Sequence, residues 1–340
     1  MLRIVQISPD YVTTPPEKYG GIERIVYELT EQLVKKGHEV FLYALPGSKT
    51  SGRLIEYSHW GDPSEIAQYV KNTLPSSVDI IHDHTHGSVV GRSELPIPMV
   101  CSIHVPWCNE ISNPVFLCDA MRTKLNAGRG YVVHNGIDRE DCLFSAEKSD
   151  YLLFLGRLIE SKGILKAIEI AEKTKLRLVI AGPETDIVDP ESTTFFIRHI
   201  LPKIRKHPNI IYVGEVGGAY KQHLLNRAKC LLFMSDDEAF GLVMIEAMAC
   251  GTPVLALRNG AVPEILREFP ELICSDLSEA ALKLKTIDLP DPYRLRECFL
   301  QNFTSETMVD NYLELYKRVL NQNLGGNFIA ENLRIDASLQ

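Results

Sequence analysis

Residues 235–265, SDDEAFGLVMIEAMACGTPVLALRNGAVPEI, hold the pattern that decides the fold. Glu238 and Glu246 stand on either side of a turn-like Ala-Phe-Gly, and the apolar residues that follow recur at the spacing of a helix. The pattern predicts a loop that leads into a helix beginning near Phe240. Residues 251–253 end this helix, and residues 254–257 predict a short buried strand.

A second loop, Arg258-Asn259-Gly260-Ala261, follows that strand and precedes another helix at Pro263. Gly260 permits a positive φ angle. A turn just before a helix directs free N–H groups, and the positive end of the helix dipole, at whatever lies there. We therefore expect Asn259 and Gly260 to help bind an anionic ligand.

The whole segment resembles the donor-binding segment of the retaining glycosyltransferases of family 4, which have the GT-B fold. In that family two glutamates separated by seven residues precede a small-residue turn, a short strand and a glycine-bearing loop before Pro-Glu, and this chain has each part. The family often has proline at the position of Met234. This difference affects the stiffness of the loop rather than its chemistry. The resemblance covers about residues 1–320 and is strongest over residues 151–265.

The composition is typical of a globular chain, since 340 residues with 45% hydrophobic and 24% charged residues predict two domains. The formal net charge of -8 indicates no nucleic acid partner, because phosphate backbones are held by clustered Lys and Arg. Two short basic patches, Lys35-Lys36 and residues 203–207, are typical of solvated helix faces. Peripheral contact of these patches with a membrane surface is an alternative that stays open.

The cysteines predict a cytoplasmic protein with reduced, buried thiols, because they form no Cys-x-x-Cys pair and most have apolar neighbours. The N-terminal MLRIVQIS has too few apolar residues before Pro9 for a signal peptide. The sequence also has no run of about 18 uncharged apolar residues, so we expect no spanning helix. The eight cysteines are at positions 101, 108, 118, 142, 230, 250, 274 and 298.

The N-terminal residues predict a Rossmann-type unit of strand, glycine loop, helix and strand. Residues 2–7 are an apolar strand, Gly20 and Gly21 open a helix, and residues 39–44 form the next strand. The paired glycines bring backbone N–H groups to the helix N-terminus, where a diphosphate or a sugar can bind, although a plain tight turn has the same pattern. Family 4 proteins carry a Gly-Gly here that faces the active-site cleft.

Histidines follow two of the predicted strands. On an extended strand His82, His84 and His86 share one face, which is a spacing that a metal ion could use, but the family has a similar motif here without a metal. His104 ends the strand predicted within residues 98–106, at the carboxyl edge where ligands bind in open α/β sheets. A lone histidine is more often structural, but in the family the matching histidine touches the donor sugar.

The second half of the chain begins again with a strand at residues 151–155, followed by Arg157 and Lys162 around a glycine-bounded turn. Two cations so placed can neutralise a diphosphate from two sides, although a pair of solvated charges is commoner. In the family this Arg and Lys hold the donor diphosphate. Further strands are predicted at residues 176–181 and 210–216, and the family uses the backbone around the end of the latter, Val213, Gly214, Glu215 and Val216, to contact the nucleotide base.

Alternating strands and helices predict an α/β protein of GT-B fold, with two Rossmann-like doubly wound domains facing across a cleft. We expect an N-terminal, acceptor-side domain over residues 1–145 and a donor domain over residues 146–304. A C-terminal helix and tail would occupy residues 305–340, and by resemblance the helix returns to the first domain. A helix is predicted over residues 116–125, and from Gly325 the chain becomes polar, as in a disordered or packing tail.

The resemblance implies transfer of a sugar, with retention of configuration and without a metal ion, from a nucleotide diphosphate sugar to a glycan, lipid or small-molecule acceptor. A UDP-sugar is favoured and GDP-mannose stays open; no cofactor is expected, and neither the acceptor nor the oligomeric state is specified. Glu238 and His104 would contact the sugar, Glu246 the ribose, and Arg157 with Lys162 the diphosphate. By the same resemblance the segment Phe240, Gly241 and Leu242 lines the donor site.

Three other hypotheses remain beside this one. A GT-B epimerase or phosphorylase would act on a nucleotide sugar or a glucan without the same acceptor chemistry. A metal hydrolase built on His82, His84, His86 and His104 would require a bound metal. A nucleotide-sugar binding protein without turnover is the third, and the presence of Glu238, Arg157 and Lys162 disfavours it.

Overall fold

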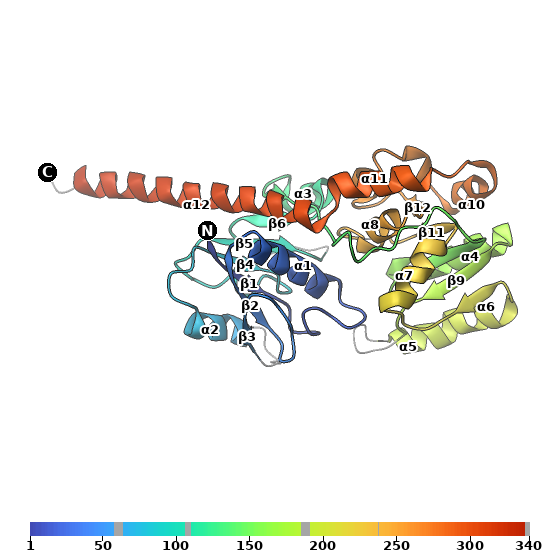
Figure 1. Ribbon diagram of the computed structural model, residues 1–340, viewed down its shortest axis with the longest axis horizontal. Helices are drawn as coiled ribbons and strands as arrows, with labels where there is room; N and C mark the ends of the chain where they lie inside the picture. Colours follow the sequence, from blue (N-terminus) through green and yellow to red (C-terminus); the bar gives the residue numbers. More distant parts are fainter. Residues whose placement is uncertain (58–63, 106–109, 185–190, 237, 337–340) are drawn as a thin grey trace. The chain divides into compact units, whose positions relative to one another are not determined.

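The computed structural model describes residues 1–57, 64–105, 110–184, 191–236 and 238–336, and side chains as far as residue 322. The chain divides into two compact units. Unit 1 comprises Met1–Pro16, Gly20–His134 and Ser305–Gln340, and unit 2 comprises Glu17–Tyr19 and Asn135–Thr304. Figure 1 colours both along the sequence, so that the red helix α12 is seen to rejoin the blue N-terminal elements of unit 1.

Unit 1 is built on a parallel sheet with the strand order β3-β2-β1-β4-β5-β6-β7. Its strands are β1 (Arg3–Ile7), β2 (Glu39–Ala44), β3 (Arg53–Glu56), β4 (Ile80–Asp83), β5 (Met99–Ile103), β6 (Pro114–Phe116) and β7 (Tyr131–Val132). Its helices are α1 (Gly21–Lys35), α2 (Ser64–Thr73), α3 (Asp119–Asn126) and α12 (Ser305–Asp336).

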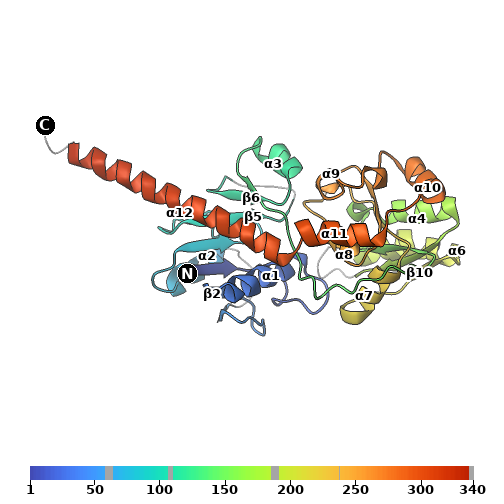
Figure 2. The ribbon, with the colours of Figure 1, turned by 45° about the horizontal axis from the view of Figure 1, so that its top comes forward.

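The central strands of unit 1 are buried because helices cover both faces of a parallel sheet, and their apolar residues are interrupted by the buried polar residues Gln6, His82, Asp83 and Ser102. Every residue of β4 and β5 is buried, as are the last four residues of β1. α12 packs against α1, and Figure 2 draws the two helices side by side. Tyr312 and Tyr316 of α12 have no exposed surface, so this helix contributes directly to the core of unit 1.

Unit 2 repeats the architecture with a parallel sheet in the order β10-β9-β8-β11-β12-β13. Its strands are β8 (Tyr151–Leu155), β9 (Arg177–Ala181), β10 (Ile210–Tyr212), β11 (Cys230–Phe233), β12 (Val254–Leu257) and β13 (Ile273–Cys274). Its helices are η1 (Glu160–Lys162), α4 (Ile164–Thr174), α5 (Ser192–Phe195), η2 (Phe196–Ile200), α6 (Leu201–Lys206), α7 (Gly218–Arg227), α8 (Leu242–Ala249), α9 (Val262–Ile265), η3 (Pro270–Leu272), α10 (Leu277–Thr286) and α11 (Pro292–Asn302).

Both sheets reverse their strand order at one point, between β1 and β4 in unit 1 and between β8 and β11 in unit 2. In a doubly wound sheet the loops leaving these two strands diverge, and ligands bind at the carboxyl ends on either side of the reversal. The expected doubly wound fold of each half is therefore confirmed. The position of the reversal also indicates where a site lies in each unit. In unit 1 this place is after β1 and β4, and in unit 2 it is after β8 and β11.

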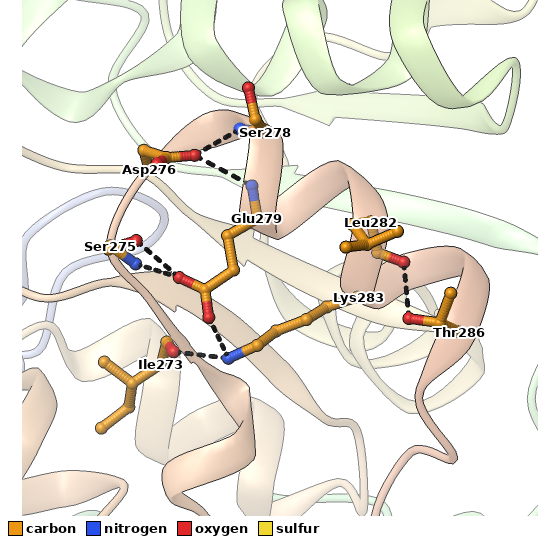
Figure 3. A network of polar contacts seen from close by, with 8 residues as sticks. All are labelled: Ile273, Ser275, Asp276, Ser278, Glu279, Leu282, Lys283 and Thr286. Atoms are coloured by element: carbon orange, nitrogen blue, oxygen red, sulfur yellow. Dashed lines mark hydrogen bonds and ion pairs between the residues drawn. The ribbon is translucent and has the colours of Figure 1, made fainter.

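The start of α10 shows how local sequence defines a helix boundary in unit 2 (Figure 3). Asp276 caps the helix by accepting hydrogen bonds from the backbone N–H groups of Ser278 at 2.7 Å and Glu279 at 2.9 Å. Glu279 in turn accepts from the N–H and hydroxyl of Ser275 and pairs with Lys283 at 2.9 Å. These bonds, that from the Ser275 backbone first, lower the pKa of Glu279 to about 2.

Several expected boundaries were wrong. Phe116 belongs to β6, and the helix expected over residues 116–125 begins at Asp119 instead. The strand expected over residues 210–216 ends at Tyr212, which leaves Val213–Val216 in a loop. The helix after Glu238 begins at Leu242, because Gly241 takes a left-handed conformation, and α12 continues to Asp336 with no break at Gly325.

The cysteines and basic patches fit ordinary structural roles. Seven cysteines are buried free thiols, and Cys108 lies outside the described residues. Lys36 pairs with Asp310, while Lys203 and His207 both pair with Glu172, so acidic neighbours partly neutralise the two patches. Within the described parts of the chain, every helix is too short or too polar to cross a membrane.

Candidate functional site

The reversal point of unit 2 holds an ion pair between two residues that the sequence singled out. Lys162 ends η1, which follows β8, and Glu238 lies in the loop after β11. The two side chains meet with Lys162 Nζ 2.5 Å from Glu238 Oε2, and each is 20% exposed. A cation and an anion are thus held together at the carboxyl edge of the sheet, with part of each side chain still open to solvent.

Backbone bonds hold the surrounding loops around this pair. The carbonyl of Ser161 accepts from the N–H of Asp236 at 2.8 Å and from the hydroxyl of Ser235 at 3.1 Å. Asn259, in the loop after β12, donates from Nδ2 to the carbonyl of Ser235 at 2.8 Å. The Asn259 amide therefore joins two loops of the site.

Gly260 allows the loop after β12 to approach the loop that carries Glu238. Its φ is +45°, and a Cβ atom built there would lie 2.3 Å from the carbonyl oxygen of Glu238, which is closer than atoms can pack. The helix that follows, α9, has only four residues. Its dipole is weaker than expected from the sequence, so the close backbone approach is the larger contribution of this turn.

Glu246 lies in α8 and is 4% exposed, consistent with a position inside a helix. Its Oε1 accepts a hydrogen bond from Nζ of Lys221 in α7 at 2.7 Å. Lys221 belongs to no motif, and sequence reasoning missed it because its partner is 25 residues away on another helix. Lys221 supplies a counter-charge to this buried carboxylate and helps to fix its orientation.

The other residues predicted in unit 2 lie in the core, at helix starts and in loops after strands. Arg157 follows β8 and is half-buried beside the Lys162 turn. Phe240 is 2% exposed and belongs to the core, Gly241 caps α8 with φ of 88°, and Leu242 is the first residue of that helix. Val213–Val216 follow β10 at the edge of the sheet, where the N–H of Val213 donates to the carbonyl of Ile180 in β9 and the carbonyl of Gly214 accepts from the N–H of Gly182.

In unit 1 the paired glycines open α1. The carbonyl of Gly20 accepts from the N–H of Arg24 at 3.2 Å, and Gly21 is the first residue of the helix. A Cβ on Gly20 would lie 2.6 Å from Cβ of Pro16 and 2.9 Å from Val12, so only glycine fits between these neighbours. The turn is tight for packing reasons, and it also places the first N–H groups of α1 beside the end of β1.

The histidines of unit 1 surround a hollow at the ends of β4 and β5. His84 and His104 are bonded to each other, with Nδ1 of His84 2.9 Å from Nε2 of His104. Burial lowers the pKa of His104 to about 3 and that of His84 well below its usual range, so both rings are neutral near pH 7. The hollow is lined by Ile22, His84, Thr85, His86, Gly87, Ser88, Ser102, Ile103, His104 and Val105.

The same bonds bear on the hypothesis of a metal site. His82 bonds Tyr316 through Nδ1 at 2.7 Å and Ser102 through Nε2 at 2.8 Å. His84 uses its second nitrogen, Nε2, to bond Gln6 at 2.8 Å. A metal ion would have to displace these bonds, and the described residues contain no cluster of three or more His, Cys, Asp or Glu side chains suited to a metal.

Comparison with known proteins agrees with this geometry. Residues 140–292 match the family model for glycosyl transferases group 1, and residues 19–141 match the model for glycosyltransferase family 4. One human relative, which forms part of phosphatidylinositol N-acetylglucosaminyltransferase, is 23% identical over 366 residues, which cover 88% of this chain and 73% of that protein.

Two solved structures show the fold. AviGT4, a glycosyltransferase involved in avilamycin A biosynthesis, is 28% identical with a TM-score of 0.77 and covers 94% of this chain and 98% of its own. The Anabaena protein HepE, in complex with UDP and glucose, is 16% identical with a TM-score of 0.65, covers 94% of this chain and 100% of its own, and shows likeness of fold alone. With both family models matched along one GT-B chain, this protein belongs to the group 1 glycosyltransferases of family 4 and is a sugar-transferring enzyme.

Proposed function

We propose that the enzyme transfers a sugar from a nucleoside diphosphate sugar with retention of anomeric configuration and without a metal ion. The observation that carries the proposal is the ion pair of Lys162 and Glu238 at the reversal point of the unit 2 sheet. A donor of this class brings a diphosphate and a sugar side by side. A lysine and a carboxylate 2.5 Å apart match these two groups, the cation facing the phosphates and the anion facing sugar hydroxyls.

In this mechanism the residues act mainly on the leaving diphosphate. Negative charge grows on the phosphates as the glycosidic bond breaks, and Arg157 with Lys162 would stabilise that charge in the transition state. Glu238 would hold the sugar hydroxyls in place, and His104 would contact the same sugar. Because none of these residues is an evident covalent nucleophile, we favour attack by the acceptor on the face from which the diphosphate departs.

Glu246 has a different role in this proposal. It is buried, and its carboxylate is oriented by Lys221, so it suits a pair of vicinal hydroxyl groups such as those of the ribose. The contact would be equally strong before and during the reaction. It would therefore support donor binding rather than the chemical step.

The donor proposed first is a UDP-sugar, and UDP-N-acetylglucosamine and UDP-glucose are the first to test. The human relative described above forms part of an N-acetylglucosaminyltransferase, which supports this choice. GDP-mannose is the comparison donor. Metal independence is supported by the two cationic side chains, which can take the part that a divalent ion plays in other sugar transferases.

The experiment combines donor binding with product stereochemistry. Thermal shift with UDP, GDP, ADP and their sugars identifies the base, since a ligand at 100 times its Kd adds about 2.7 kcal/mol of stability. Slow donor hydrolysis is then followed by proton NMR in excess EDTA. We expect an α-linked donor to release the α-sugar first. Release of the β-sugar would contradict retention, and loss of turnover in EDTA, restored by magnesium or manganese, would contradict metal independence.

A further inference from the structure

Buried polar side chains of unit 1 connect the long C-terminal helix to His104 through consecutive hydrogen bonds. The residues come from β1, the ends of β4 and β5, and α12: Gln6, His82, His84, His104 and Tyr316. All of them except His104 are fully or almost fully buried, and His104 reaches the hollow at the end of β5. Buried bonds of this kind fix which atom carries each proton, because no water competes for them.

Two contacts set the direction of the network. Nε2 of Gln6 lies 3.2 Å from the hydroxyl oxygen of Tyr316, and that oxygen lies 2.7 Å from Nδ1 of His82. An amide nitrogen can only donate a hydrogen bond, so the Gln6 amide donates to the phenol. The phenol O–H is then free to donate to His82.

The direction propagates from Gln6 to His104. The Gln6 carbonyl oxygen can only accept, so Nε2 of His84, 2.8 Å away, carries the proton of that bond. A neutral imidazole has one N–H, and Nδ1 of His84 is thus an acceptor. Nε2 of His104, 2.9 Å from it, must be the donor. Nδ1 of His104 is then an acceptor, and within the described part of the chain it has no hydrogen-bonded partner.

We propose that Gln6 and His84 are positioning residues that hold the proton of His104 on Nε2, so that Nδ1 accepts a hydrogen bond from a hydroxyl group of the donor sugar. The inference rests on the proposed function, which names His104 as a sugar contact. The opposite arrangement, with the proton on Nδ1, would present an N–H donor suited to a phosphate or carbonyl oxygen. The network therefore favours, as the ligand of His104, a hydroxyl group that donates its hydrogen to Nδ1.

The first test is independent of catalysis. Nitrogen-15 NMR of the histidine rings in the full-length protein reports which nitrogen carries the proton, and the His104 signals are assigned by their loss in His104→Asn. We expect the proton on Nε2 and a coupling to Nδ1 of His84 across the hydrogen bond. Finding the proton of His104 on Nδ1 would overturn the inference.

The second test separates positioning from packing. His84→Leu removes the acceptor, whereas His84→Asn supplies a carbonyl oxygen close to the place of Nδ1. We expect His84→Leu to lower kcat/KM by about 5-fold to 10-fold, the effect of about one hydrogen bond, with unchanged affinity for free UDP, and His84→Asn to recover most of the loss. Ser305→Ala is the matched control, because Ser305 is fully buried in unit 1 and bonds Gln32 but belongs neither to the lining of the hollow nor to the path from Gln6 to His104.

The outcomes distinguish this inference from the proposed function. Equal loss of activity in His84→Leu, His84→Asn and Ser305→Ala would indicate a packing effect and overturn the inference. An enzyme that turns over nucleotide sugars but carries the His104 proton on Nδ1 would contradict the inference alone. A protein that neither binds nor turns over any nucleotide sugar would contradict the proposed function, whatever NMR shows for His104.

Discussion

Lys162 Nζ donates a hydrogen bond of 2.5 Å to Oε2 of Glu238, although 76 residues separate the two in the chain. The pair exists because η1 follows β8, the Glu238 loop follows β11, and these strands are neighbours at the point where the sheet order reverses. The Ser161 carbonyl bonds both Ser235 and Asp236 and so holds the two loops together. The order of strands in the sheet, more than local sequence, therefore brings Lys162 and Glu238 together.

Arg157→Ala and Lys162→Ala should each damage the chemical step. If each cation meets a diphosphate whose charge rises in the transition state, its loss raises the barrier by about 2.7 to 4 kcal/mol, which is about 100-fold to 1,000-fold in turnover. Steady-state rates at saturating donor measure this. Lys166→Ala is the control, because Lys166 pairs with Asp236, a more exposed residue of the loop that carries Glu238. Wild-type turnover in both variants would contradict the assignment.

Glu238 and Glu246 should differ in what they bind. Glu246→Gln should weaken free UDP and the UDP-sugar alike, because a ribose contact is the same in the ground state and the transition state. Glu238→Gln should lower turnover without weakening free UDP, since Lys162 then loses this carboxylate partner and remains available to the phosphates. Isothermal titration calorimetry of both variants with UDP measures this difference in affinity. Equal loss of UDP affinity in the two variants, or none in Glu246→Gln, would show that the roles are wrongly assigned.

Lys221 should support nucleotide binding through Glu246. The Glu246 side chain is 5% exposed and that of Lys221 is 22% exposed, so loss of the ion pair affects the more deeply buried carboxylate more than it affects the lysine. Lys221→Met should weaken UDP by about 5-fold, the effect of about one hydrogen bond, and lower the melting temperature. Lys221→Arg keeps the charge and should recover part of both. Unchanged UDP affinity in Lys221→Met, measured by titration, would leave the lysine with a structural role only.

The sequence predicted the parts of this fold that depend on local pattern. Apolar runs such as residues 151–155 and 176–181 became β8 and β9 because a parallel sheet buries both faces, and the glycine turns marked where loops leave strands. The family resemblance predicted that Glu238 and Lys162 belong to one site. No local sequence pattern predicts the ion pair between them. Whether the named residues bind the donor stays a prediction.

The remaining features depend on contacts between distant residues. Lys221 is an ordinary helix lysine until α7 packs beside α8, and Gln6 is an ordinary strand residue until its amide meets Tyr316, 310 residues away. The spacing of Tyr312 and Tyr316 is that of one helix face, and both residues are buried, but periodicity does not show what their hydroxyl groups bond. Phe116 was assigned to a helix because a three-residue strand such as β6 is too short to show the alternating pattern of a strand.

The buried histidines of unit 1 should make stability fall as the pH drops below about 6.5. Burial lowers the pKa of His82 and His84 well below 6.5 and that of His104 to about 3, whereas the unfolded chain titrates near 6.5. Between these values the unfolded state binds more protons than the folded state, so the free energy of unfolding decreases with falling pH. Each such histidine contributes a slope of about 1.4 kcal/mol per pH unit, and above pH 6.5 the contribution vanishes.

Urea unfolding of the full chain at pH 7.5, 6.5, 5.5 and 5.0 measures this slope. His84→Asn removes one of the three histidines and keeps a polar side chain, so its curve should be flatter than that of the native protein below pH 6.5 while the two run parallel above it. His199→Asn is the matched control, because His199 lies on the exposed part of η2 in unit 2. Native and His84→Asn proteins with the same slope between pH 6.5 and 5.0 would mean that His84 takes up its proton in the folded state, and that the chain of neutral rings from Gln6 to His104 does not persist.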